Sequence, residues 1–412
     1  MSIIYLLLTI LIIFITGPTW AQTAAPSVII PQSSVVHLED AGKRAHTNTL
    51  ILQLGDPKAA PPDLFGATPQ LPPFPGFNYE TPASLACLYG LVKATAGCNP
   101  RTLKTNATTG SKVVAIVNAY DAPTVLSDLK KYSRQFGLPA INSANFQVIY
   151  AAGTRPPYDQ GWAQESGLDV EMVHALAPMA KIILVEAASN SFVDMLQAET
   201  VAAKAVAAAG GGEVSNSWGS EEFPAEMTAA YTAPFTKAKV VFFAATGNNS
   251  PPSYPAVLPT LVAVGGTSIL RDSAGNFIAE TTWRRAGVGP SMFVPRPGFQ
   301  SSVKAIVGSK RGTPDISAVA NPNTGVWVYW NGGWYIFGGT SVATPILAAI
   351  TNSANHFKTS TTAELVKIYE NISKTSFRDI KQGTCGDTQS FSAALGYDFC
   401  TGVGTPHGFS GL

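Results

Sequence analysis

Two periodicities of apolar and polar positions alternate along residues 112–266. Short runs rich in Val, Ile and Phe predict buried strands, whereas runs with apolar residues three and four positions apart predict amphipathic helices. The expected strands cover residues 112–120, 146–152, 181–188, 213–218, 240–246 and 261–266. The expected helices cover residues 122–137, 163–178, 192–211 and 225–239.

Strands that alternate with helices are typical of the α/β class. The pattern predicts a mostly parallel central sheet with helices on both faces. In open sheets of this kind, ligands bind at the carboxyl ends of the strands. The residues that follow the strands at 112–120, 213–218 and 240–246 are therefore the first place to look for a functional site.

The N-terminal part of the chain predicts export. Residues 3–15 are apolar and are followed by Gly17-Pro18 and small residues, which indicates a signal peptide over 1–21. The alternative is an uncleaved membrane anchor, but the apolar run is short for a span. Residues 22–78 are expected to be a short extension, with one strand near 48–55 and a Pro-rich linker, and residues 79–412 the main domain.

The charge and the cysteines of the chain indicate which partners it can bind and in which compartment it folds. The net charge is +1 and only 13% of the 412 residues are charged, so no basic surface predicts nucleic acid or an anionic membrane as a partner. Four cysteines fit an oxidising compartment. Local pairing, Cys87 with Cys98 and Cys385 with Cys400, is the simplest of three possible schemes, and a zinc site lacks the C-x-x-C spacing that would support it.

Ser341 is the strongest candidate nucleophile. It lies in "GGTSVATP" (338–345), where small residues lead into an apolar helix, and a helix N-terminus favours developing negative charge. A serine nucleophile needs a base, which in most serine hydrolases is histidine. Of the five histidines, only His174 remains a geometric possibility; the others are His37, His46, His356 and His407.

The helix that carries His174 also offers two carboxyl groups. Glu165 and Asp169 are four residues apart, so both side chains lie on one face of the expected helix. If the two groups share a proton, one stays ionised while the other orients it. A carboxylate base suits acidic conditions, in which a histidine would be protonated. A solvated acidic face is the alternative interpretation.

Five ordered segments carry a specific resemblance to a known family. They are "ESGLDVEMVHALAP", "SNSWG" (215–219), "RGTPDISAVANPNTG" (311–325), "GGTSVATP", and "FRDI" with "GYDFCTGVGTP" near the C-terminus. Together they resemble the sedolisin (serine-carboxyl peptidase) family over residues 79–412, which implies a subtilisin-like fold. The resemblance implies Ser341 as nucleophile, Glu165 as base, Asp169 as its partner, and substrate binding by Ser217, Trp218 and Gly219.

The same resemblance implies one structural Ca²⁺ in the C-terminal loop. Its ligands would be the carboxylates of Asp379 and Asp398 together with backbone carbonyls of Ile380, Ala394 and Gly396. Carboxylates combined with carbonyl oxygens make a site for a hard cation. An ordinary loop with surface aspartates is the alternative.

Two features depart from the family pattern. Sedolisins usually place an aspartate where this chain has Asn248, and an asparagine amide can donate to an oxyanion at any pH. The family also usually carries a large folded propeptide, for which residues 22–78 are too few. Control of the enzyme by a prosegment is therefore an open question at this point.

These observations predict a secreted, monomeric serine-type endopeptidase that acts on polypeptide substrates at acidic to mildly acidic pH with a Ser-Glu-Asp triad. They predict no nucleic-acid partner and no stable membrane association after signal cleavage. The alternative is a catalytically inactive relative that binds peptides or surfaces.

Overall fold

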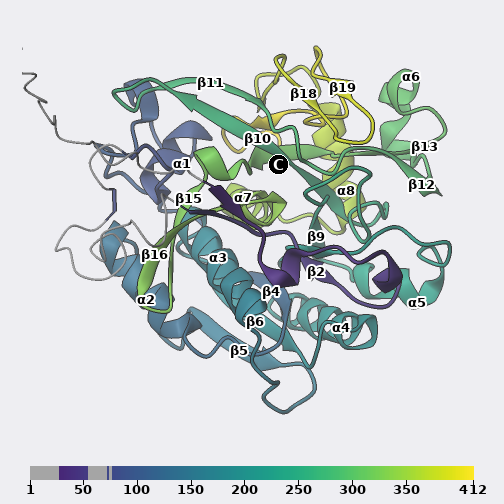
Figure 1. Ribbon diagram of the computed structural model, residues 1–412, viewed down its shortest axis with the longest axis horizontal. Helices are drawn as coiled ribbons and strands as arrows, with labels where there is room; N and C mark the ends of the chain where they lie inside the picture. The colour runs from purple at the N-terminus through teal and green to yellow at the C-terminus, as the bar shows by residue number, and fades with distance from the viewer. Residues whose placement is uncertain (1–26, 54–71, 74–76) are drawn as a thin grey trace, which may run out of the picture.

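The computed structural model describes residues 27–53, 72–73 and 77–412, so the expected signal peptide and most of the Pro-rich linker lie outside the described residues. Within them a sheet of eight strands forms the centre of the molecule (Figure 1). Its order is β11-β10-β9-β7-β4-β6-β5, with β14 beside β10. Neighbouring strands are parallel except for the pair β10–β11. The strands are β4 (Val113–Ala119), β5 (Phe146–Tyr150), β6 (Lys181–Ala187), β7 (Gly212–Asn216), β9 (Val240–Ala245), β10 (Val262–Arg271), β11 (Phe277–Thr282) and β14 (Ile316–Val319).

Both faces of this sheet are buried, which explains the nearly continuous apolar runs of its strands. Along β4, Val114 and Ile116 belong to one hydrophobic core, whereas Val113, Ala115 and Val117 belong to the other. Helices α2, α3 and α7 pack on the first side, and α4 covers the second. The predicted α/β architecture is confirmed. The helices are α1 (Pro82–Leu88), α2 (Val125–Phe136), α3 (Gln160–Leu176), α4 (Phe192–Ala208), α5 (Ala229–Thr232), α6 (Lys304–Val307), α7 (Thr340–Ala354) and α8 (Thr361–Glu370).

One predicted helix is wrong in its extent. The expected helix over 225–239 is a single turn, α5, followed by a 3-10 turn over Ala233–Phe235. Pro234 explains the break, because proline lacks the N–H that continues a helix and disfavours helical backbone in the residue before it. The sheet strand expected over 261–266 is longer than predicted, since β10 continues to Arg271 beside β11.

Three short strands from residues 27–53 pack against the main domain, although sequence analysis placed these residues in an extension. β1 (Ser27–Ile29) pairs with β3 (Leu50–Gln53), and β3 pairs with β16 (Gly333–Gly338). β2 (His46–Thr47) pairs with β8 (Trp218–Gly219). In Figure 1 this purple segment runs across the front of the molecule beside α7.

The remaining strands form small antiparallel units. They are β12 (Gly289–Pro295) with β13 (Lys310–Thr313), β15 (Val326–Trp330) with β16, β17 (Phe377–Arg378) with β20 (Thr405–Pro406), and β18 (Thr384–Cys385) with β19 (Phe391–Ser392). Among residues 27–53, 72–73 and 77–412, no helix is both long and apolar enough to cross a membrane.

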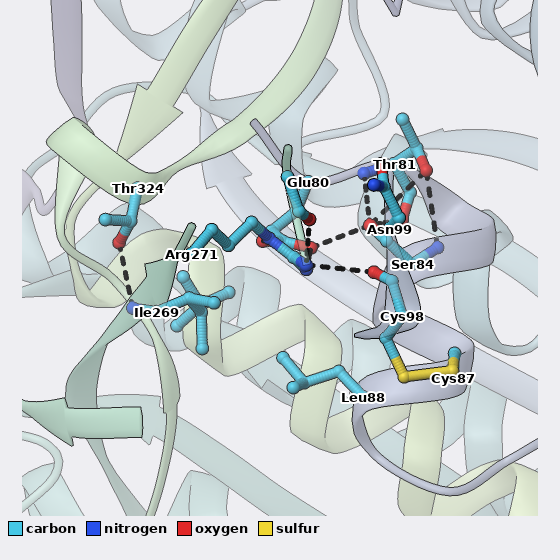
Figure 2. Close-up of polar contacts among 12 residues, drawn as sticks. Glu80, Thr81, Ser84, Cys87, Leu88, Cys98, Asn99, Ile269, Arg271 and Thr324 are labelled. Carbon is cyan, nitrogen blue, oxygen red and sulfur yellow. Dashed lines mark hydrogen bonds and ion pairs between the residues drawn. A yellow bond between two sulfur atoms is a disulfide. The ribbon is translucent and has the colours of Figure 1, made fainter. Parts of the chain in front are cut away.

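Two local disulfides, Cys87–Cys98 and Cys385–Cys400, confirm the simplest pairing. Figure 2 shows how the first lies beside a buried ion pair, in which Arg271 contacts Glu80 at 2.7 Å and donates to the Cys98 carbonyl at 2.9 Å. The guanidinium of Arg271, on β10, therefore joins the residue that precedes the N-cap of α1 to the disulfide loop. Removing one partner of such a buried pair typically costs about 3–5 kcal/mol.

Candidate active site

Ser341 lies in the first turn of α7, where the sequence predicted a hydroxyl at a helix N-terminus. Gly339, at the start of the helix, has φ of 97°, and a Cβ at this position would lie 1.9 Å from the carbonyl oxygen of Asn48. Only glycine allows both this backbone conformation and this close approach. Pro345 lacks the N–H that would bond to the Ser341 carbonyl oxygen, and Ser217 Oγ lies 3.3 Å from that oxygen.

The hydroxyl of Ser341 donates to Glu165 Oε2 at 2.9 Å. Glu165 lies on α3, which packs against α7, and both side chains are fully buried. The structure therefore brings together a serine and a carboxylate that are 176 residues apart in sequence. This is the relationship of a nucleophile to a base.

Asp169 lies one helical turn beyond Glu165 and is held by two donors. Ser217 Oγ donates to its Oδ1 at 2.6 Å, and Asn118 Nδ2 donates to its Oδ2 at 3.0 Å. Burial and the adjacent charge of Asp169 raise the pKa of Glu165 well above its usual value, and burial also raises the pKa of Asp169. Two carboxyl groups this close lose their protons in two coupled steps, so the pair as a unit sets the pH at which a carboxylate base becomes available.

Asn248 lies just beyond β9 and faces the same point. Its Oδ1 accepts from the Thr340 N–H at 2.9 Å, which orients the amide, and its Nδ2 donates to the Asn48 carbonyl oxygen at 2.8 Å. The Ser341 N–H also points at this oxygen, at 3.4 Å. Two donors thus converge on one peptide carbonyl beside the serine hydroxyl, which is the arrangement of an oxyanion hole.

The backbone of residues 217–219 binds an extended segment of the chain itself. β8 pairs with β2 so that Trp218 lies opposite Thr47 and Gly219 opposite His46, and the Ser217 carbonyl accepts from the Asn48 N–H at 3.2 Å. The three residues predicted to bind substrate therefore form the edge along which an extended peptide lies. Asn118, Ser217 and Asn248 lie at or just beyond the carboxyl ends of β4, β7 and β9. The sequence predicted a functional site at these ends of the strands.

His174 makes no described contact with Ser341. Its Nε2 lies 3.0 Å from the Pro139 carbonyl oxygen, and burial lowers the pKa of its imidazole. Glu165, not His174, is hydrogen-bonded to the serine.

The two predicted calcium carboxylates converge on one loop. Asp379 Oδ2 accepts from the Gly396 N–H at 3.1 Å, and Asp398 Oδ2 accepts from the Ala394 N–H at 2.8 Å. Asp379 Oδ1 is buried and has no hydrogen-bond partner among the described residues. An orphaned carboxylate oxygen next to the loop that Cys385–Cys400 closes fits a hard cation. The described residues hold no group of three or more His, Cys, Asp or Glu side chains that could bind a metal, and the expected site requires only two carboxylates.

Sequence reasoning missed three residues of the site: Asn48, Thr49 and Asn118. Asn118 could have been found, because it is a buried polar residue at the carboxyl end of an apolar strand. Asn48 and Thr49 lie in a segment assigned to an extension, and their contacts are with residues more than 100 positions away.

Comparisons with known proteins identify the family. The family model of the "Subtilase family" matches residues 148–385. Kumamolisin from Bacillus sp. (strain MN-32) is 29% identical over 72% of this chain and 58% of its own length, and sedolisin from Pseudomonas sp. (strain 101) is 34% identical over 37% of this chain and 28% of its own length. This chain thus spans well under two thirds of these relatives.

Solved structures support the same fold. Pseudomonas sedolisin, a serine-carboxyl proteinase complexed with two molecules of pseudo-iodotyrostatin, superposes with a TM-score of 0.66 at 23% identity and covers 80% of this chain and 96% of its own. A psychrophilic protease, S41, superposes with a TM-score of 0.52 at 17% identity, over 80% of this chain and 98% of its own. On the family match, the relatives and the site together, the chain belongs to the subtilase family and, within it, to the sedolisins.

Proposed function

We propose that the chain is a secreted serine-type endopeptidase that hydrolyses peptide bonds with Ser341, Glu165 and Asp169. The observation that carries the proposal is the convergence of the Ser341 hydroxyl, the Glu165 carboxylate and two oxyanion donors on one peptide carbonyl. The two solved structures named above are a serine-carboxyl proteinase and a protease by name, and the paired disulfides fit an exported protein.

In the proposed mechanism Ser341 Oγ attacks the carbonyl carbon while its proton passes to Glu165 Oε2. The negative charge that develops on the carbonyl oxygen is stabilised by Asn248 Nδ2 and the Ser341 N–H. Glu165 then gives the proton to the leaving amine, and water hydrolyses the resulting ester. One oxyanion donor of this kind contributes roughly 100- to 1,000-fold to kcat.

The carboxyl pair sets one limit of the proposed pH range. When the pair carries one proton, the negative charge is best placed on Glu165 Oε2, where the Ser341 hydroxyl donates to it. The retained proton then lies on Asp169, because a proton on either oxygen of Glu165 would neutralise the base. The proposed acidic to mildly acidic range rests on the resemblance to sedolisins, and the raised pKa of both buried carboxyl groups sets the acidic limit of activity.

A single structural Ca²⁺ is part of the proposal. Asp379, Asp398 and the carbonyls of Ile380, Ala394 and Gly396 would hold it, and the ion would supply charge that rigidifies the C-terminal loop and takes no part in the reaction. The chain is proposed to act as a monomer on polypeptides.

The test is hydrolysis of a denatured protein substrate by the full chain from pH 3 to 7. Ser341→Ala should abolish hydrolysis, and Glu165→Gln should reduce it at least 1,000-fold, because both remove groups that move the proton. His174→Ala is the matched control on the same helix, and its kcat should stay within a few-fold of wild type. If no Ser341-dependent cleavage occurs, either of added substrate or of the chain itself, the inactive peptide-binding alternative is correct.

A further inference from the structure

The segment that lies along β8 shows how an extended peptide meets the site. The Asn48 carbonyl oxygen faces the oxyanion donors described above, so the bond after Asn48 is the one presented to Ser341. Counting back from that bond, Thr47 is the second residue and His46 the third, and both lie opposite β8. Ala45 is the fourth residue, and its backbone contacts a different part of the protein.

Both polar groups of the Ala45 backbone bond to Asn190. The Ala45 N–H donates to the Asn190 backbone carbonyl at 2.8 Å, and the Ala45 carbonyl accepts from Asn190 Nδ2 at 2.8 Å. Asn190 lies between β6 and α4, immediately before Ser191, which is the N-cap of this 17-residue helix. One residue thus pairs with the peptide as a neighbouring strand would, with a side-chain amide in place of a backbone N–H.

The amide of Asn190 is oriented by Tyr120. The phenolic O–H of Tyr120 donates to Asn190 Oδ1 at 3.1 Å. Because Oδ1 accepts this hydrogen bond, Nδ2 is the atom that faces the Ala45 carbonyl. Rotating the amide by half a turn would place two acceptor oxygens face to face and would leave the phenol opposite another donor. The phenol therefore selects the orientation in which the amide binds a peptide carbonyl.

Tyr120 has a strained backbone. Its φ is 65°, in the left-handed region that bulky residues rarely adopt. The Tyr120 N–H bonds to the Ala187 carbonyl at the end of β6, and its ring packs edge-on against Trp162 of α3, with the ring centroids 6.4 Å apart. Strain of this kind persists only where the surrounding contacts hold it, and it gathers at functional sites. The strained backbone is thus a second observation, besides the hydrogen bond, that points to a role for Tyr120.

The position of Tyr120 in the fold connects peptide binding to the catalytic carboxyl groups. Tyr120 directly follows β4, and Asn118, two residues earlier on this strand, donates to Asp169. Trp162, against which Tyr120 packs, lies one turn before Glu165 on α3. The end of one strand therefore contacts both the catalytic pair and the residue that binds the peptide.

We propose that Tyr120 is a positioning residue that orients Asn190 to bind a substrate at the fourth residue before the cleaved bond. The inference rests on the proposed peptidase activity and specifies its substrates, which are polypeptides with at least four residues on the amino side of that bond. The bound segment continues beyond this point, since the Phe192 N–H donates to the Lys43 carbonyl oxygen at 2.8 Å. A binding path that extends past the fourth residue fits cleavage within a chain and not the removal of shorter N-terminal peptides.

The size of the effect follows from the contacts. The Asn190 amide supplies one neutral hydrogen bond, which is typically worth roughly 2- to 10-fold in affinity. Its loss lowers kcat/KM only for substrates that carry a carbonyl at the fourth position. Tyr120 acts through Asn190, so replacing both residues should cost no more than replacing Asn190 alone.

The test compares two acetylated peptides copied from the chain. The longer, residues 45–52, carries the carbonyl of the fourth residue, and the shorter, residues 47–52, lacks it. The kcat/KM of each peptide is measured with full-length wild type, Tyr120→Phe, Asn190→Ala and the double variant. Tyr158→Phe, at a tyrosine that is 54% exposed, is the matched control. The ratio of the two values is compared between proteins, because the fraction of chains with an accessible site cancels in it.

Wild type and the control should favour the longer peptide about tenfold or more, because it makes at least two further hydrogen bonds. Tyr120→Phe and Asn190→Ala should each lower kcat/KM roughly 2- to 10-fold for the longer peptide and leave the shorter one within about twofold of wild type. The double variant should match Asn190→Ala.

Four outcomes would overturn the positioning role alone: a wild type without preference for the longer peptide, losses by the variants that are absent or equal on both peptides, additive losses in the double variant, or cleavage of neither peptide by a chain that hydrolyses denatured protein. If wild type hydrolyses neither the peptides nor denatured protein, the proposed peptidase activity itself fails.

Discussion

Replacing Glu213 with glutamine should make the protein more resistant to a rise in pH. Glu213 lies on β7, is 1% exposed, and accepts a hydrogen bond from Asn352 Nδ2 at 2.7 Å at the far end of α7. Burial raises the pKa of Glu213 to about 8. Glutamine has nearly the same shape and keeps an oxygen that can accept from Asn352, but it cannot ionise.

The direction of this pH effect follows from the number of protons that the folded and the unfolded protein bind. An unfolded glutamate ionises at about pH 4.3, so above that pH the unfolded chain has released a proton that the folded protein retains. The stability contributed by neutral Glu213 is fully present below that pH and is lost as the pH rises towards about 8. The slope is at most about 1.4 kcal/mol per pH unit for one group, so Glu213→Gln should gain roughly 2–3 kcal/mol relative to wild type between pH 5 and 7.

Thermal unfolding measures this difference. For a chain of 412 residues the entropy of unfolding is roughly 0.8 kcal/mol/K, so the melting temperature of Glu213→Gln should rise by about 3 °C relative to wild type between pH 5 and 7. Glu370→Gln, the same replacement at an exposed position, is the control. A difference between Glu213→Gln and wild type that is equal at pH 5 and pH 7 would refute the reasoning, because Glu213 would then not retain its proton on folding.

Three further predictions concern the site and the calcium loop. Asn248→Asp should retain activity only where the new carboxyl is protonated, so its kcat/KM should fall roughly 100- to 1,000-fold relative to wild type as the pH rises from 3 to 7, and identical pH profiles would contradict the role of the amide. Ser217→Ala removes the donor to Asp169, so the acidic limb of the kcat profile should move to higher pH; a uniform loss without a shift would indicate a packing effect. Chelation of calcium should lower the melting temperature of wild type by several degrees and leave Asp379→Asn unchanged, whereas an equal response of both would place the ion elsewhere.

Much of the fold and of the site was predictable because its signals are local. The strands are buried on both faces, so their apolar runs are continuous and easy to recognise. Glu165 and Asp169 lie four residues apart on one helix, and this spacing alone places both carboxyl groups on one face. Ser341 lies at the start of an apolar helix, and the glycines before it indicate that another part of the backbone approaches closely there.

The rest depends on contacts between distant positions. Asn48 and Ser341 are 293 residues apart, and no pattern within residues 45–49 distinguishes a strand that fills a cleft from a strand of a sheet. The pairing of β1 with β3 and of β3 with β16 likewise joins segments that no periodicity connects. The overlong helix at 225–239 is a different error, since Pro234 is visible in the sequence and ends the helix despite the helical spacing around it.

Burial raises the pKa of several carboxyl groups in this protein, but a rise in pH then has opposite consequences for stability and for catalysis. Burial raises the pKa of Glu213 to about 8 and that of Glu364 to about 7, and stability is lost as these groups ionise with rising pH. Burial also raises the pKa values of Glu165 and Asp169, and this pair must release one proton before Glu165 can act as a base, so activity is lost as the pH falls. The working range is bounded below by the chemistry and above by the fold. Both limits arise because a carboxylate base and several structural glutamic acids lie in the same apolar interior, where burial raises the pKa of each group.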